Sequence, residues 1–417
     1  MIESKRKITS RKQRRQMNIL IIGNGFDLAH NLPTKYTDIL EFLRIIKITS
    51  TWMGDQPSFI SKHLNNYNAP NYVKNCVENA FSTRQPNLHK SASNSNLLVQ
   101  EIYDNLTDNV WYEYLLDIYT KGKMKGINWI DFESEISSII EQIDRYQENL
   151  YMPFDIKSSD ENEKLKSFLS KLNFEAFIEN KYPDKSHIPT YRDFLDKSYY
   201  DLRCFVRCME IYLLECVEKQ PINILSQDII NTNANSILCF NYTHTYEKLY
   251  VNNDKVKIHY LHGKTQDNIA SNNMVLGIDE YYSTYEKDQH TNYNIYKKFT
   301  QRVINETGFL YRNWIAKMDD ITYKFRNYPT LEETGASLPN NVYIFGHSLD
   351  ITDKDVIRDF INRDGVKTTL FYYDKQQQTQ QIANLVKMLG QDTFINMINS
   401  IPQRICFVQQ QPMIPKN

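Results

Sequence analysis

A short apolar strand that runs directly into glycine constrains the fold of this chain more than any other feature. Residues 18–22 read NILII and are followed by Gly23, Asn24 and Gly25. Four apolar residues in succession are typical of a strand buried on both faces, as in a parallel sheet. A helical pattern then runs from Thr34, a residue type that caps helices, to about Ile48. The chain therefore opens with a strand, a glycine turn and a helix.

Further strand patterns return only in the second half of the chain, at 236–240, 256–261, 274–276, 342–345, 367–373 and 404–408. Helical patterns at about 353–363 and 378–398 separate the last three of these strands. Strands that alternate with helices predict a parallel, doubly wound sheet. Between the two groups of strands, the patterns are mainly helical, at 97–120, 130–147, 161–180 and 191–219.

The predicted fold class is therefore α/β, with a Rossmann-like, mostly parallel sheet that a large, mainly helical insertion interrupts. At 417 residues, the chain is long enough for more than one hydrophobic core. We expect a basic N-terminal extension over residues 1–16. A nucleotide-binding core is expected over 17–50 and 227–417, and the insertion over 51–226.

Glycine is scarce, and its positions indicate where a site is to be expected. The chain has 12 glycines in 417 residues, less than half of the usual ~7%. Ligands of open α/β sheets bind beyond the carboxyl ends of the strands. The glycines at the ends of predicted strands are Gly23, Gly25, Gly263, Gly277 and Gly346.

The first glycine turn offers a phosphate site, although its motif is incomplete. Glycines between a strand and a helix let backbone amides approach a phosphate. The dinucleotide-binding pattern, however, requires a third glycine where this chain has Leu28, so a tight turn alone also fits. Two nearby residues carry the same ambiguity. Asp27 is either a ligand contact or a helix cap, and His30 is either a ligand contact or a buried core histidine.

Two later strand ends carry candidates for catalysis. Asn241 follows the strand at 236–240 and offers both a donor and an acceptor, suited to a ribose hydroxyl, a water or a turn. His262 ends the next strand beside Gly263, which clears space for a general base. His259 would point to the opposite face of that strand, so we expect no metal site.

Candidates also follow the strand at 342–345 and open one helix of the insertion. Gly346, Ser348 and Asp353 form either a ligand-binding edge or a set of turn and helix caps. Asp131 and Glu133 stand at the start of a helical pattern, where we expect a solvated face that the helix dipole stabilises.

The remaining bulk properties predict a cytoplasmic protein. The sequence contains no run of about 18 apolar residues that could span a membrane, and its first residues lack the apolar stretch of a secretory signal. The six cysteines form no C-x-x-C pair, and Cys204, Cys208 and Cys216 share a helical pattern typical of core burial. The net charge of -1 gives no support for a nucleic-acid partner. The basic residues 5–15 predict a solvated tail, with a phosphate- or nucleic-acid-binding arm as the alternative.

In their order along residues 18–374, these motifs resemble the AbiH family, phage-defence proteins that act by abortive infection. The most specific stretch is NILIIGNGFDLAHNLPTKYTDILEFL. Other matching segments are NWIDFESEI, CFNYTHTYE, LHG, VLGIDE, IFGHSLDITDKDV and TLFYYD. The resemblance implies a role in stopping phage replication, with a phage-derived trigger.

The chain also resembles, more distantly, the sirtuin-like domains that bind or hydrolyse NAD in bacterial defence. The counterparts are the first glycine turn with Leu32-Pro33, then Asn241, then His262-Gly263, then Gly346 with Ser348. Asn24 replaces an alanine of that turn, a departure that affects how the nucleotide would lie there. The four-cysteine zinc module of deacetylating sirtuins is missing, so the resemblance does not favour a lysine deacylase.

The sirtuin-like resemblance implies NAD as substrate or ligand. Asn241 would position ribose or water, and His262 would act as the base. Gly23, Asn24 and Gly25 would receive the pyrophosphate, with Asp27 near the ribose and Ser348 beside the adenosine half. His30, Gly263, Gly346 and Asp353 complete the expected binding residues.

The leading hypothesis is cleavage of the nicotinamide–ribose bond of NAD or a related nucleotide. The first alternative is a non-catalytic nucleotide-binding sensor that signals to a partner, and the second is a nucleic-acid-targeting effector that uses the basic tail. A membrane partner is not expected, and the sequence leaves a homo-oligomer open.

Overall fold

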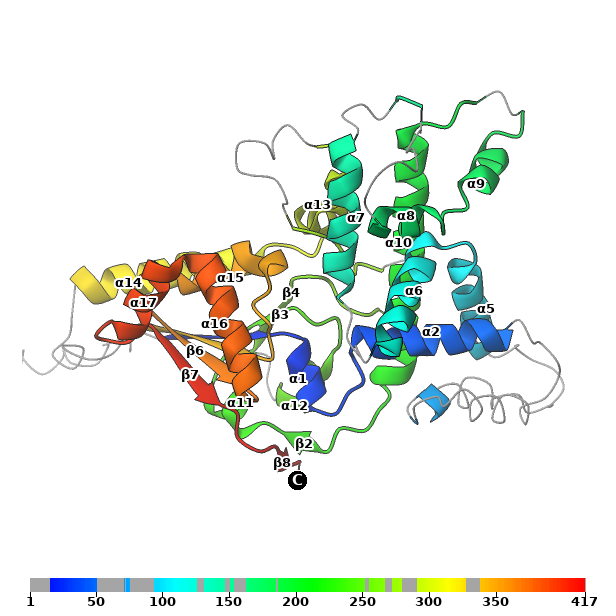
Figure 1. The fold of residues 1–417 in the computed structure, drawn as a ribbon. Coiled ribbons are helices and arrows are strands. Elements are labelled where there is room, and N and C mark those ends of the chain that lie inside the picture. The colour runs from blue at the N-terminus through cyan, green and yellow to red at the C-terminus, as the bar shows by residue number, and fades with distance from the viewer. Residues whose placement is uncertain are drawn as a thin grey trace, which may run out of the picture.

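The structure is a computed structural model, and it describes residues 16–50, 71, 73–75, 94–125, 131–146, 151–153, 163–184, 187–251, 255–266, 272–279, 291–327 and 338–416. The basic residues 5–15 lie outside this described part. The described chain forms a sheet covered by helices and, beside it, a mainly helical part (Figure 1). Among these residues, no helix is both long enough and apolar enough to cross a membrane.

Six parallel strands form the sheet, in the order β4-β3-β1-β5-β6-β7. Numbered along the chain, this order is 3-2-1-4-5-6, the order of doubly wound dinucleotide-binding sheets. The strand from the N-terminus lies in the middle, between β3 and β5. The strands are β1 (Met17–Ile22), β3 (Ser236–Cys239), β4 (Lys257–Tyr260), β5 (Asn340–Phe345), β6 (Val366–Tyr372) and β7 (Ile405–Gln409).

Helices cover both faces of the sheet, as the apolar run of β1 predicts. Ile19 and Ile21 pack into one core cluster, whereas Leu20 and Ile22 pack into another on the opposite face. The helices of the first face are α14 (Leu310–Asn327), α15 (Lys354–Ile361), α16 (Lys375–Leu389) and α17 (Gln391–Asn399). Those of the second are α1 (Asn24–Ala29), α11 (Gln227–Asn231) and α12 (Thr245–Tyr250).

The helical part has its own aromatic-rich core, around the fully buried Trp111, Phe168 and Phe205. Its helices are α2 (Tyr36–Ser50), α5 (Asn94–Leu106), α6 (Val110–Met124), α7 (Phe132–Tyr146), α8 (Glu163–Leu169), α9 (Phe174–Lys181) and α10 (Tyr191–Tyr212), which continues into a π-helical turn (Leu213–Val217). Cys208 and Cys216 are buried in this core, as their spacing predicts, whereas Cys204 of the same pattern is only half-buried. Residues from α2, from 274–278 and from 293–296 pack into the same core, so the helical part draws on chain outside 51–226.

Several elements differ from the sequence patterns, and among them the pattern at 161–180 is divided into α8 and α9. The apolar residues 274–276 form no strand of the sheet, because Met274 and Leu276 pack into the helical core instead. The pattern at 378–398 is divided into α16 and α17 by Gly390, which has a φ of +82°. The pattern at 97–120 is divided into α5 and α6, because Asn109 caps α6 by accepting a hydrogen bond from the Tyr112 amide.

Candidate functional site

A cavity of about 820 Å³ lies beyond the carboxyl ends of β1, β3 and β5. Its lining includes Gly23 after β1, Asn241 after β3 and Gly346 after β5. Strand order reverses between β1 and β5, which is where ligands bind in doubly wound sheets. The helical part supplies the rest of the wall, with Glu133 of α7 and Met209 of α10.

Nine of the eleven residues that the sequence nominates line this one cavity: Gly23, Asn24, Gly25, Asp27, Asn241, His262, Gly346, Ser348 and Asp353. His30 does not line it, because its ring is buried between the Phe26 carbonyl and the Tyr250 hydroxyl, at 2.7 Å from each. Gly263 does not line it either. Its φ is +74°, and a Cβ there would lie 2.1 Å from the Asn273 carbonyl oxygen, so the turn itself requires glycine.

The two glycine turns at the base of the cavity contact each other through their backbones. The Gly25 amide donates to the Gly346 carbonyl oxygen at 2.7 Å, and the Phe26 amide donates to Gly23 at 2.8 Å. Gly346 has a φ of +67°, and a Cβ there would lie 2.1 Å from the Phe26 nitrogen. These contacts support the interpretation of a tight turn. A phosphate bound here could use the Gly25 or Phe26 amide only by breaking them.

His262 is buried and paired with a carboxylate. Its Nε2 lies 3.0 Å from Oδ1 of Asp353, which also forms an ion pair with Lys298 at 2.9 Å. Burial alone would raise the pKa of Asp353, but Lys298 and His262 hold it well below its usual range. Burial and the Lys298 charge lower the pKa of His262 to about 4, which outweighs the attraction of Asp353. His262 is therefore neutral at neutral pH.

The pairing with Asp353 determines which nitrogen of His262 is free. Because Asp353 is ionised, Nε2 of His262 carries the proton and donates a hydrogen bond to the carboxylate. The other nitrogen, Nδ1, is buried and has no hydrogen-bond partner among the described residues. It is the atom that can accept a proton.

Four more buried polar atoms of the cavity wall share this property. Among the described residues, four atoms have no hydrogen-bond partner: Oδ1 of Asp27, Nδ2 of Asn241, Oγ1 of Thr34 and Oε1 of Gln381. Buried polar atoms in folded proteins are rarely left without one. Their concentration at one cavity indicates a polar ligand or bound water.

Asp27 lies within α1, not at its N-cap, which excludes the capping alternative. Its carboxyl is 1% exposed, and Oδ2 accepts a hydrogen bond from the Thr243 hydroxyl at 2.8 Å. Thr243 in turn accepts one from Thr245 at 3.0 Å. Burial raises the pKa of Asp27 to about 6, even though these hydroxyls favour the ionised form.

The expectation of a solvated face at the start of α7 is wrong for Glu133. Its Oε2 accepts hydrogen bonds from Lys298 at 2.8 Å and from Thr352 at 3.0 Å. Burial raises the pKa of Glu133 to about 7 despite the ion pair with Lys298. Asp131 instead caps α7, accepting a hydrogen bond from the Glu133 amide at 3.0 Å. Lys298, which opens α13 (Lys298–Ile304), thus joins Glu133 to the partner of His262.

Sequence patterns carry no signal for Lys298, because it belongs to no motif and opens a short helix. His259 is also structural: its ring contacts the carbonyl oxygens of Thr307 and Gly308 at 3.2 Å. Within the described ranges, no cluster of three or more His, Cys, Asp or Glu side chains is arranged to hold a metal ion.

The comparisons with known proteins give a single match. Residues 19–374 match the family model described as bacteriophage abortive infection AbiH. No curated protein and no solved structure matches the chain at a significant level. The family match includes β1 to β6, most of the cavity wall and the helical part, and it implies a role in phage abortive infection. The chain belongs to the AbiH family of bacteriophage abortive infection proteins.

Proposed function

We propose that the cavity binds NAD or a related nucleotide and that the protein cleaves the nicotinamide–ribose bond. The observation that carries this proposal is the buried His262–Asp353 pair, which borders a cavity at the reversal of strand order together with Asn241. The strand order 3-2-1-4-5-6 supports a Rossmann-like nucleotide site. The distant sirtuin-like resemblance supports NAD as the nucleotide.

The chemistry requires a held ribose, one water and a proton acceptor. When the bond between ribose C1′ and the pyridinium nitrogen breaks, both electrons leave with neutral nicotinamide. The oxocarbenium-like ribose then takes up water, and one proton is released. In this proposal, Nδ1 of His262 accepts that proton, and Asp353 stabilises the imidazolium that forms.

The other free polar atoms would hold the ribose. Nδ2 of Asn241 is a donor for a ribose hydroxyl or for the attacking water, and Oδ1 of Asp27 is an acceptor on the same wall. Ser348 is exposed at the rim, where its carbonyl oxygen accepts a hydrogen bond from Asn384 at 2.9 Å, and it would border the adenosine half. A phage-derived trigger would activate the protein, which would then deplete cytoplasmic NAD. Without NAD, the cell stops growing and the phage cannot replicate.

The test is release of nicotinamide from NAD by the purified protein, with and without extract of phage-infected cells. We expect His262→Ala to slow release by about 10²–10⁴-fold, the usual contribution of a general base. Asn241→Ala should also lower it, whereas His187→Gln, a histidine outside the cavity, should not. If the wild type releases no nicotinamide under triggering conditions, the hydrolase proposal fails.

One observation favours a non-catalytic sensor as the second candidate. A histidine with a pKa of about 4 is a weak base at neutral pH, because catalysis is most efficient when the pKa of the base lies near the working pH. A sensor would be stabilised against heat by NAD without releasing nicotinamide, and this stabilisation would persist in His262→Ala. For the nucleic-acid alternative, deletion of residues 5–15 should abolish toxicity, whereas both nucleotide proposals expect little effect.

A further inference from the structure

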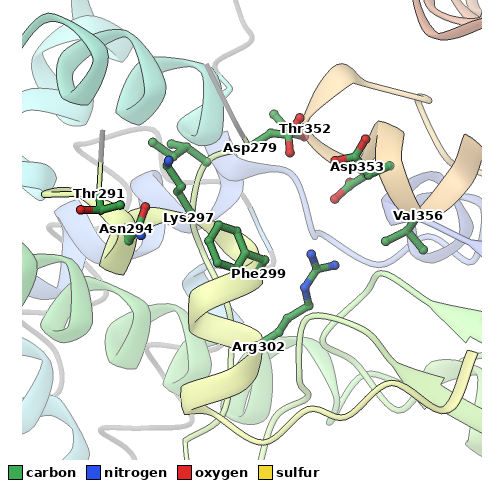
Figure 2. Close-up of a pocket in the computed structure, with 11 residues that line it drawn as sticks. Asp279, Thr291, Asn294, Lys297, Phe299, Arg302, Thr352, Asp353 and Val356 are labelled. Carbon is green, nitrogen blue, oxygen red and sulfur yellow. The ribbon is translucent and has the colours of Figure 1, made fainter. Parts of the chain in front are cut away.

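A second, smaller cavity of about 310 Å³ lies beside the first (Figure 2). Thr352 and Asp353 belong to the walls of both cavities. The remaining wall comes mainly from the segment before α13, from α13 itself and from the start of α15. In Figure 2, the side chain of Arg302 extends from α13 toward Asp353 and Val356, with Phe299 beside it.

The carboxylates around this cavity already have cationic partners. Asp353 pairs with Lys298 at 2.9 Å. Asp279 pairs with Lys354 at 3.1 Å, and Asp355 pairs with Arg358 at 3.4 Å. Arg302 has no ion pair with any residue that the structure describes, and its Nε is buried without a hydrogen-bond partner. Asp353, Asp279 and Asp355 attract the guanidinium only at longer range, and each of them is already paired with another cation.

A largely buried guanidinium without a partner is unfavourable for the protein alone. Burial lowers the pKa of Arg302, which reflects the lost hydration of its charged form. The guanidinium presents five N–H donors in a plane, a geometry that matches the two oxygens of a carboxylate or phosphate. Phe299, whose side chain is 49% exposed, offers an apolar surface next to this charge.

We propose that this cavity is a second binding site, for a small molecule whose carboxylate or phosphate group pairs with Arg302. Phe299 contacts the apolar part of that molecule. Since Asp353 forms part of both walls and holds Nε2 of His262, occupancy of the second site acts on the first through this carboxylate. The site is independent of the nucleotide chemistry proposed above, because its occupancy is measured by binding alone.

The first experiment uses two anions as probes, inorganic phosphate and benzoate, at constant ionic strength set with sodium chloride. We expect at least one of them to raise the Tm of the full-length protein by a few degrees, saturably. Arg302→Gln should lose this shift. Arg326→Gln, which removes an arginine with 60% side-chain exposure on α14, should keep it. The probe that acts distinguishes a phosphate from a carboxylate ligand, and an equal shift in Arg302→Gln, or none with either probe, overturns the proposal.

A second variant keeps the proposal testable if Arg302→Gln folds poorly. Arg302→Met retains the length and apolar stem of the side chain but removes the unpaired charge. In the absence of added anion, its Tm should be equal to or higher than that of the wild type, because functional charges of this kind reduce stability. A loss of several degrees in Tm would mean that Arg302 makes a stabilising interaction within the protein itself, which overturns the proposal.

Discussion

At the scale of single residues, Asp27 combines deep burial with an ionisable group. Its pKa is raised to about 6, so the folded protein binds this proton more tightly than the unfolded chain does. The contribution of the Asp27 proton to the free energy of unfolding is therefore complete below about pH 4 and is lost as the pH rises through about 6. The buried carboxylate is therefore a cost that the protein carries at neutral pH.

Asp27→Asn should remove this cost, because the amide oxygen can still accept the hydrogen bond from Thr243. Each pKa unit is worth about 1.4 kcal/mol, so the variant should be more stable than the wild type by about 2 to 3 kcal/mol at pH 7.5. Urea unfolding at pH 7.5 and 4.5 measures the difference, which should narrow by about 2 kcal/mol at the lower pH. A difference that does not change with pH would contradict burial as the origin of the shift.

Gly346 offers a second residue-scale prediction. Gly346→Ala should lower the free energy of unfolding by about 2 to 4 kcal/mol, since the new Cβ would lie 2.1 Å from the Phe26 nitrogen in addition to the left-handed strain. Gly308→Ala is the matched control. Its φ of +81° carries the same strain, but no atom lies within 4 Å of the added carbon, so a loss of about 1 kcal/mol is expected. Equal losses in urea unfolding would argue against the contact between the two turns.

Most residues that the sequence nominates line the cavity because they follow strands, and parallel strands end at one edge. The sequence left two roles open for His30, because a histidine at the end of a short helix can face either the ligand or the core. Lys298 and Arg302 could not be found in this way, and Glu133 was expected on a solvated face although it is buried against Lys298. Their importance lies in pairings, or missing pairings, between segments far apart in the chain, which no local pattern encodes.

At the scale of elements, buried ion pairs join α7 and α13 to Asp353, at the start of α15. Lys298 lies between the carboxylates of Glu133 and Asp353, at 2.8 and 2.9 Å. Lys298→Met leaves two buried carboxylates facing each other and should lower the free energy of unfolding by about 3 to 5 kcal/mol. Glu133→Gln keeps the pairing of Lys298 with Asp353 and removes a carboxyl whose pKa burial raises, so little or no loss of stability is expected.

Chemical denaturation of both variants at pH 7.5 measures this contrast. If Glu133→Gln lowered the free energy of unfolding as much as Lys298→Met does, the ion pair between α7 and α13 would contribute more to stability than the pairing of Lys298 with Asp353. If both were harmless, the three side chains would not be paired as the structure shows.

The elements that the sequence predicted best are those with an unbroken local signal. The apolar run of β1 indicated burial on both faces, and its place between β3 and β5 explains why. The residues at 274–276 carry a similar apolar run, but tertiary contacts with the helical core prevail over it. Strand order was beyond the sequence, because it depends on which crossover passes over which face.

At the scale of the whole molecule, the helical part is a wall of the candidate site. Glu133 and Met209 face the same cavity as Asn241 and Gly346. Under the nucleotide proposal, ligand binding should therefore slow backbone hydrogen exchange in both parts of the molecule.

Hydrogen exchange with and without NAD tests this expectation. Amides of α7 and of the segments 23–36 and 240–243 should exchange more slowly with ligand. Amides of α9 and α17, which contribute no residue to the cavity, should not change. Slowing that is confined to the sheet would mean that the helical part does not enclose the ligand.

The contact between the turns at Gly25 and Gly346 has an evolutionary consequence. This junction is held by main-chain atoms, so its geometry does not depend on the side chains that face the cavity. Those side chains are free to diversify while the scaffold beneath them stays constant. A phage-defence protein benefits from this separation of scaffold and cavity side chains, because phage evolve quickly. Substitutions can then change what the cavity recognises without destabilising the fold.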